Sequence, residues 1–154
     1  MLGLVDNKKV VIVGIPGVGK TSLVTKLVEL ITQQNKTVGV HSFGTVMLEE
    51  AMKNGIKDRD ELRTLPIEKQ QELQKMAAED ISNMEDDVIL IDTHAFISTK
   101  SGFYPGLPNY VIQIMQPTNF IAITASPDEI HDRRMKDKTR NRDPVSIEDI
   151  KKEL

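Results

Sequence analysis

The sequence contains no cysteine and no tryptophan, and only 4% of its residues are aromatic. Without cysteine, neither disulfide bonds nor thiolate metal sites can form. The three histidines, His41, His94 and His131, do not have the spacing of metal ligands. No apolar run approaches the roughly 18–20 residues that a membrane span needs, and residues 1–9 lack the apolar core of a signal peptide. These absences predict a cytoplasmic protein that does not enter a membrane.

The composition predicts one compact domain with a hydrophobic core. The chain has 154 residues, of which 39% are hydrophobic and 28% are charged. Its formal net charge of −3 argues against a general nucleic-acid-binding protein, which is usually basic over a broad face.

Short apolar runs alternate with helical patterns along the chain. Four runs are rich in β-branched residues and have the length of buried strands, at residues 9–13, 37–41, 88–91 and 120–124. Apolar spacing and capping residues predict helices over residues 20–34 and 43–53, after Pro66, at residues 111–115, and after Ser126 and Ser146. Residues 103–108 are rich in glycine and proline, which predicts a loop. The alternation predicts an α/β fold with helices on both faces of a four-stranded parallel sheet.

Residues 14–21, which we call the phosphate loop, match the pattern G-x-x-x-x-G-K-[ST] at every position. Glycines let the backbone turn so that successive N–H groups face phosphate oxygens, and the start of the next helix adds further donors. Lys20 can reach the β- and γ-phosphates, and the Thr21 hydroxyl can ligate Mg²⁺. A purely structural turn requires neither three glycines nor a Lys-Thr pair. We therefore predict that a nucleoside triphosphate is bound through Gly14, Ile15, Pro16, Gly17, Val18, Gly19, Lys20, Thr21 and Ser22.

An acidic residue, Asp92, ends the apolar run of residues 88–91. In P-loop proteins such an aspartate lies beside the phosphates and holds Mg²⁺ directly or through water. The alternative role is a cap for the following turn. His94 follows in the same region, where it either contacts substrate or packs against its neighbours.

Residues 133–142 include six basic side chains, four of them arginines. A solvated basic helix face is one interpretation. Arginine, however, binds phosphate in a bidentate manner and stays charged. Transfer of a phosphoryl group between two nucleotides gathers negative charge that needs such cations, and a mobile lid would also exclude water. We therefore predict an arginine-rich lid.

Several segments together resemble the archaeal-type adenylate kinases, which are P-loop nucleoside monophosphate kinases. In the order of the family they are residues 14–21, Phe-Gly-Thr-Val-Met at residues 43–47, Asp-Arg-Asp at residues 58–60 with Arg63, Asp-Thr-His at residues 92–94, Gly-Phe-Tyr-Pro-Gly-Leu-Pro at residues 102–108, and residues 133–143. Many families share the phosphate loop, whereas the second, fourth and fifth segments are far more specific. Alone, residues 42–47 and 58–63 are adequately explained by a helix start and a salt-bridged helix face.

The resemblance implies reversible transfer of the γ-phosphoryl group of MgATP to AMP, giving two ADP. It implies one P-loop kinase domain, a three-layer sandwich, over residues 1–154, with an AMP-binding insert at about residues 42–84 and a lid at about residues 133–143. It assigns AMP binding to Ser42, Phe43, Gly44, Thr45, Met47, Arg63, Thr93, His94 and Gly106. It assigns catalysis to Lys20, Arg134, Arg140 and Arg142, and Mg²⁺ binding to Thr21 and Asp92. The expected partners are ATP and AMP, and the expected assembly is a homotrimer.

The resemblance also implies that the chain is truncated at its C-terminus. Family members continue after the lid through a helix, a fifth strand and a final helix, whereas this sequence ends at Leu154. Part of the donor-base site would then be missing, so a nucleotide-binding module or switch without kinase turnover is the alternative function. The Asn-Lys-x-Asp element of guanine-specific switches is absent after residues 120–124. A kinase with another acceptor, or a role in RNA handling through residues 133–142, also stays open.

Overall fold

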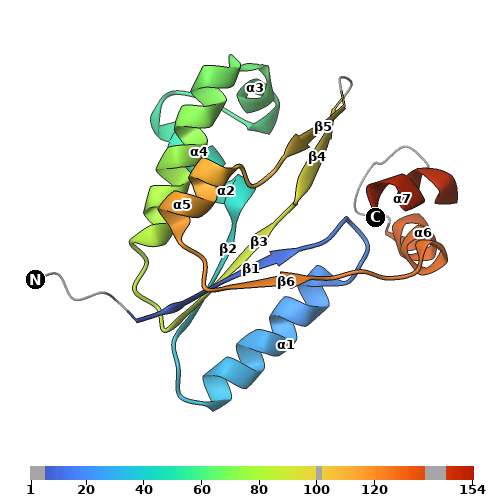
Figure 1. The fold of residues 1–154 in the computed structure, drawn as a ribbon, viewed down its shortest axis with the longest axis horizontal. Helices are drawn as coiled ribbons and strands as arrows, with labels where there is room; N and C mark the ends of the chain where they lie inside the picture. The colour runs from blue at the N-terminus through green and yellow to red at the C-terminus, as the bar shows by residue number, and fades with distance from the viewer. Residues whose placement is uncertain (1–5, 100–101, 138–144) are drawn as a thin grey trace, which may run out of the picture.

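The computed structural model describes residues 6–99, 102–137 and 145–154. Its main sheet has four parallel strands, as the sequence predicts. Their order is β2 (Val38–Ser42), β3 (Val88–Thr93), β1 (Lys8–Val13) and β6 (Asn119–Ala122). The helices are α1 (Lys20–Gln33), α2 (Phe43–Lys53), α3 (Arg59–Thr64), α4 (Ile67–Ser82), α5 (Asn109–Met115), α6 (Pro127–Lys136) and α7 (Ile147–Glu153). Figure 1 shows α1 on one face of the sheet and α2, α4 and α5 on the other.

Capping side chains fix where the shorter helices begin. Asp58 accepts hydrogen bonds from the backbone N–H groups of Asp60 and Glu61 at the start of α3. Ser126 forms a capping box with Glu129 at the start of α6, and Ser146 accepts from the N–H of Asp149 at the start of α7. These caps confirm the helix starts predicted after Ser126 and Ser146.

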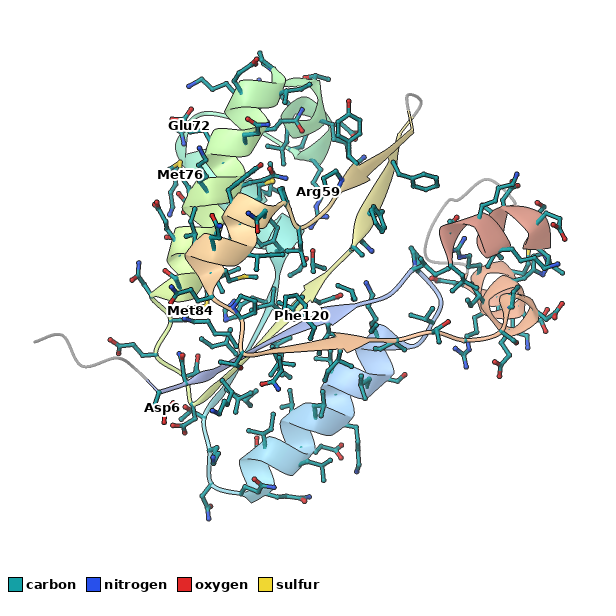
Figure 2. All side chains as sticks on the ribbon, viewed as in Figure 1. Asp6, Arg59, Glu72, Met76, Met84 and Phe120 are labelled. Atoms are coloured by element: carbon teal, nitrogen blue, oxygen red, sulfur yellow. The ribbon has the colours of Figure 1, made fainter. Side chains whose placement is uncertain are left out.

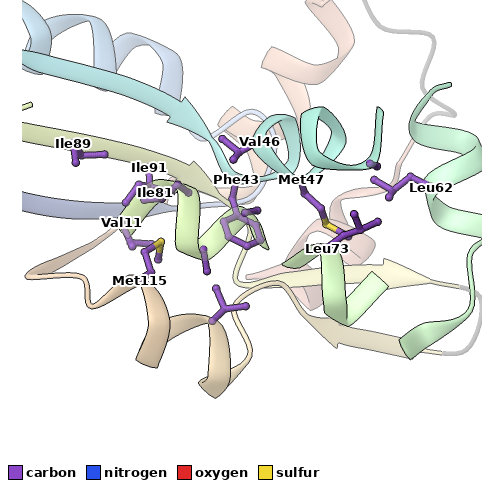
Figure 3. Close-up of a cluster of buried hydrophobic side chains, with 14 residues drawn as sticks. Val11, Phe43, Val46, Met47, Leu62, Leu73, Ile81, Ile89, Ile91 and Met115 are labelled. Carbon is purple, nitrogen blue, oxygen red and sulfur yellow. The ribbon is translucent and has the colours of Figure 1, made fainter. Parts of the chain in front are cut away.

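The main core lies between the sheet and α2, α4 and α5. Val11, Ile89 and Ile91 contribute from the strands, and Figure 3 shows them close to helical side chains such as Phe43 and Ile81. The opposite face is less enclosed, since α1 has no buried residue. Phe120, on the edge strand β6, is 55% exposed (Figure 2). The structure therefore concentrates its buried apolar surface on the side of α2 and α4.

A second sheet corrects the loop predicted at residues 103–108. Strands β4 (Phe96–Thr99) and β5 (Gly102–Pro105) form an antiparallel hairpin that projects from the sheet (Figure 1). Residues 102–105 are all exposed, so no alternation of buried and exposed positions marks this strand. Backbone pairing alone defines the strand, which is why a prediction from glycine and proline content was wrong there.

A small separate cluster joins α6 and α7 to the phosphate loop. Val18, Ile130 and Ile150 are buried together, at 5%, 0% and 0% exposure. Figure 1 shows both helices beyond the carboxyl end of β1 and β6. Burial of these three side chains stabilises the contact between the C-terminal helices and the loop.

Among the helices in the described ranges, none combines the length and apolarity that crossing a membrane requires.

A buried carboxylate links α2 to α4. Glu50 is 4% exposed; it accepts a hydrogen bond from Lys53 and shares another with Asp80. The hydrogen bond to Glu50, followed by burial, raises the pKa of the Asp80 carboxyl, while the bonds from Asp80 and Lys53 lower the pKa of Glu50. Asp80 is therefore the carboxyl of this pair that takes up a proton first as the pH falls.

We expect Asp80→Asn to raise the Tm at pH 7 by on the order of 1–2 °C, because an amide donates to Glu50 without carrying a second charge. The raised pKa of Asp80 means that the folded protein takes up a proton at higher pH than the unfolded chain does, so wild-type stability rises as the pH falls through that range. The lowered pKa of Glu50 acts only at lower pH. Thermal melts should therefore show the gain shrinking as the pH falls from 7 through the raised pKa of Asp80. A gain that is independent of pH, or one shared by the control Glu72→Gln on the same helix, contradicts this account.

Candidate functional site

The phosphate loop connects β1 to α1 and takes a shape that its glycines permit. Gly17 and Gly19 have φ angles of 92° and 100°, in the left-handed region. At Gly14, a Cβ atom would lie 2.7 Å from Val18 Cγ2 and 2.9 Å from the carbonyl oxygen of Ile123. Each glycine of the motif is therefore required either by backbone conformation or by close packing.

Lys20, at the first position of α1, lies against the end of the neighbouring strand. The pairing of β1 with β3 places Val13 opposite Thr93. The Lys20 Nζ atom donates to the Thr93 carbonyl oxygen at 3.3 Å and lies 3.4 Å from His94 Nδ1. It also lies 3.0 Å from Asp92 Oδ1. Lys20, Asp92, Thr93 and His94, predicted separately from two segments, are thus brought together.

One oxygen of the Asp92 carboxylate accepts no hydrogen bond. Its Oδ1 atom is buried and makes no hydrogen bond of acceptable geometry, although Lys20 Nζ is close enough for an ion pair. Thr21 and Ser22 are exposed in the first turn of α1 and line a shallow hollow with Thr25, Lys26 and Glu29.

No cluster of three or more His, Asp or Glu side chains able to hold a metal occurs within the described ranges. Mg²⁺ is commonly held by one or two carboxylates together with the phosphates of a nucleotide. Asp92, with its under-used oxygen, and the Thr21 hydroxyl therefore fit the protein's part of such a site.

Residues 42–45, predicted to bind the acceptor, follow β2 at the same carboxyl edge of the sheet as the phosphate loop. Ser42 lies opposite Asp92 in the pairing of β2 with β3, and α2 begins at the next residue. Phe43 and Met47 are 3% and 9% exposed and belong to the core. Thr45 and the Gly44 backbone are partly exposed and remain accessible from this edge.

Arg59 is a candidate that the residue-level predictions missed. Its Nη2 atom donates to Thr45 Oγ1 at 2.9 Å, and a Cβ atom on Gly44 would lie 3.8 Å from its Nη1. Arg63, by contrast, has a side chain 74% exposed and pairs with Asp60. The signal in the sequence was the capping Asp58, which fixes Arg59 as the first residue of α3.

Gly106 follows the β4–β5 hairpin and lies against the end of β3. Its N–H donates to the Ala95 carbonyl oxygen at 2.8 Å. A Cβ atom at this position would lie only 1.9 Å from the His94 carbonyl oxygen. The structure therefore brings Gly106 and His94 together, although 12 positions separate them in sequence.

The basic segment contacts the outer side of the phosphate loop. Arg134 Nε donates to the Pro16 carbonyl oxygen at 2.8 Å, and Arg133 Nη1 donates to that of Gly17 at 3.2 Å. The Arg134 side chain is 11% exposed and forms a bidentate ion pair with Glu153 at 2.7 and 3.3 Å. Arg140 and Arg142 lie outside the described residues.

Comparisons with known proteins find relatives over most of the chain. Residues 13–151 match the family described as AAA domain. The adenylate kinase of Methanocaldococcus jannaschii is 44% identical over 146 residues, covering 94% of this chain and 76% of its own. That of Sulfurisphaera tokodaii is 42% identical over 145 residues, covering 91% and 75%. This chain thus spans about three quarters of the length of these relatives.

A solved structure supports the fold. The shikimate kinase from Acinetobacter baumannii, in complex with shikimate, superposes with a TM-score of 0.56 and covers 96% of this chain and 74% of its own. At 13% sequence identity, this likeness concerns the fold alone. The four-stranded parallel sheet and its helices therefore share the fold of that protein.

Proposed function

Since the chain belongs to the adenylate kinase family and matches the AAA domain over residues 13–151, we propose that it transfers the γ-phosphoryl group of MgATP reversibly to AMP, giving two ADP. The observation that carries the proposal is the position of Lys20. Its ammonium group lies where the phosphate loop meets Asp92 and His94, beside the carboxyl end of β2 at Ser42. Donor and acceptor segments thus share one edge of the sheet, where ligands bind in open α/β folds.

The arrangement suits phosphoryl transfer without a general base. An oxygen of the AMP phosphate is already ionised, so the protein has to position two nucleotides and stabilise charge. Backbone N–H groups of residues 14–21 would hold the ATP phosphates, and Lys20 would leave Asp92 to reach them. Mg²⁺ bound with ATP would neutralise phosphate charge, with Asp92 and Thr21 as its protein contacts.

The acceptor side comprises residues 42–84, and the lid comprises residues 133–143. We assign AMP to the surface formed by Ser42, Gly44, Thr45, Arg59, His94 and Gly106. Thr93 is 8% exposed and would support this surface. Phe43 and Met47 would support this surface from the core rather than contact AMP through exposed side chains. We further propose a cytoplasmic homotrimer, whose subunit number sedimentation analysis would test.

A coupled assay of ADP formation tests the proposed reaction. ATP and AMP together should give ADP in the presence of Mg²⁺, and ATP alone should not. UMP, CMP and GMP, offered in place of AMP, would reveal a kinase with another acceptor. ATP binding measured by calorimetry without ADP formation with any acceptor would instead identify a nucleotide-binding module.

Arg59→Ala should raise the KM for AMP by about tenfold or more, because a charged donor to the AMP phosphate is lost. The KM for ATP should change little. Arg63→Ala is the matched control, since its exposed guanidinium pairs with Asp60 on the same short helix. If Arg63 makes the phosphate contact, as the family resemblance implies, the control will show the larger rise.

A further inference from the structure

Two arginines of α6 donate hydrogen bonds to carbonyl groups on the outer side of the phosphate loop. Arg134 Nε donates to the oxygen of Pro16, and Arg133 Nη1 donates to the oxygen of Gly17. A loop that directs its N–H groups at phosphates must direct carbonyl groups the other way, and those carbonyls need partners of their own. The two arginines supply them.

Peptide geometry connects these contacts to phosphate binding. In a trans peptide the C=O and N–H groups point in opposite directions within one plane. The bond from Arg134 to the Pro16 carbonyl therefore fixes the direction of the Gly17 N–H. The bond from Arg133 to Gly17 fixes that of the Val18 N–H in the same way. The Val18 N–H now donates to the Ile15 carbonyl oxygen, with a long N···O distance of 3.4 Å. A phosphate oxygen can replace this weak partner.

Glu153 fixes Arg134 in turn. Its two carboxylate oxygens accept from Nη1 and Nη2, which leaves Nε directed at Pro16. With its side chain 11% exposed, Arg134 is largely removed from water, and the bidentate pair restricts its rotation. A Cβ atom on Gly17 would lie 3.3 Å from both Arg134 Cγ and Ile130 Cγ2, so this contact also uses the absence of a side chain at Gly17.

We propose that Arg134 and Glu153 are positioning residues, which hold the phosphate loop in the shape that binds ATP, and that Arg134 does not touch the transferred phosphoryl group. This differs from the catalytic role that the family resemblance implies for Arg134. The inference rests on the proposed function only in taking residues 14–21 as the ATP phosphate site. The C-terminal helix α7 thereby acts on ATP binding from outside the site.

Calorimetric titration of the full chain with a non-hydrolysable ATP analogue tests the proposal. Arg134→Ala and Glu153→Ala should each weaken binding by about tenfold, through the loss of a charge-assisted contact. The double variant should be no weaker than Arg134→Ala alone, because both changes break one chain of contacts. Binding of AMP should not change. Kinetically, the KM for ATP should rise with a much smaller change in kcat.

Matched controls separate this role from the alternatives. Glu148→Gln removes an exposed carboxylate of α7 that pairs with Lys151, and it should bind the analogue normally. If an alanine variant does not fold, Glu153→Gln keeps an acceptor oxygen and should show an intermediate loss. A wild-type affinity for Glu153→Ala overturns the proposal. So does a fall in kcat of about 100-fold for Arg134→Ala with unchanged ATP affinity, which would indicate direct catalysis.

A readout without nucleotide distinguishes failure of the positioning role from failure of the proposed function. Amide hydrogen exchange at Gly17 and Val18 should be faster in Glu153→Ala than in Glu148→Gln, because the loop loses its outer support. If the wild-type chain binds no ATP analogue, the proposed function fails, and this exchange difference still tests the positioning role. Equal exchange in the two variants overturns it.

Discussion

Lys20→Ala should lower kcat/KM for ATP by about 10³-fold, the largest loss that we expect from any single substitution described here. A group that stabilises charge on the transferred phosphoryl contributes mainly in the transition state, so kcat should fall more than the affinity for ATP. The coupled assay of ADP formation measures both quantities. Unchanged turnover in this variant contradicts the assignment of the phosphate loop.

Lys26→Ala provides the matched control for this prediction. Lys26 lies on the same helix, pairs with Glu29 and is 65% exposed, so its removal should leave turnover within about twofold of the wild type. Lys20→Ala has a second consequence, because Asp92 Oδ1 would lose the cation that faces it. We expect the variant to be less stable, and the addition of Asp92→Asn to restore the Tm without restoring activity. Recovery of turnover in the double variant would show that instability, and not lost charge, caused the defect.

The sequence predicts the main sheet and the phosphate loop well because both are encoded locally. β-branched runs mark the strands, most clearly the buried central strands β1 and β3. Gly17 and Gly19 of the phosphate loop adopt the left-handed conformation that the glycine pattern of residues 14–21 predicts. Helix α2 begins and ends at the predicted residues, since Ser42 and Asn54 flank a continuous helical pattern. In these cases the residue types within one short segment are enough to predict the local structure.

Contacts between distant segments could not be predicted in the same way. Arg59 reaches Thr45 across 14 positions, and Arg134 meets Glu153 across 19. Each of these arginines lies in a charged stretch whose neighbours would have been equally good candidates. Arg134 differs from its charged neighbours in being buried, and Arg59 in standing at a capped helix start. The contacts that each arginine makes depend on how the helices pack. The β4–β5 hairpin escaped prediction for a related reason, since its exposed residues show no alternation of apolar and polar side chains.

Gly106→Ala should combine a large loss of stability with a defect specific to AMP. The added Cβ would lie 1.9 Å from the His94 carbonyl oxygen, so a rigid backbone group, and not a flexible side chain, would have to move. We expect unfolding to become easier by about 3 kcal/mol, or a Tm lower by about 10 °C in thermal melts. Gly55→Ala is the control, because Gly55 has a φ of 88° and open space around it. That substitution should cost only about 1 kcal/mol, from the left-handed conformation alone.

The displacement in Gly106→Ala should reach the site through one short stretch of backbone. The Gly106 N–H is bonded to Ala95, and the neighbouring pair Phe96 and Pro105 begins the hairpin ladder. A shift of this segment moves His94, which we assign to the AMP surface. We therefore expect the KM for AMP to rise by about tenfold or more at temperatures where the variant is fully folded, with ATP analogue binding nearly unchanged. If the variant loses stability but keeps the wild-type KM for AMP, the close approach of Gly106 to His94 serves packing alone, and Gly106 does not belong to the acceptor site.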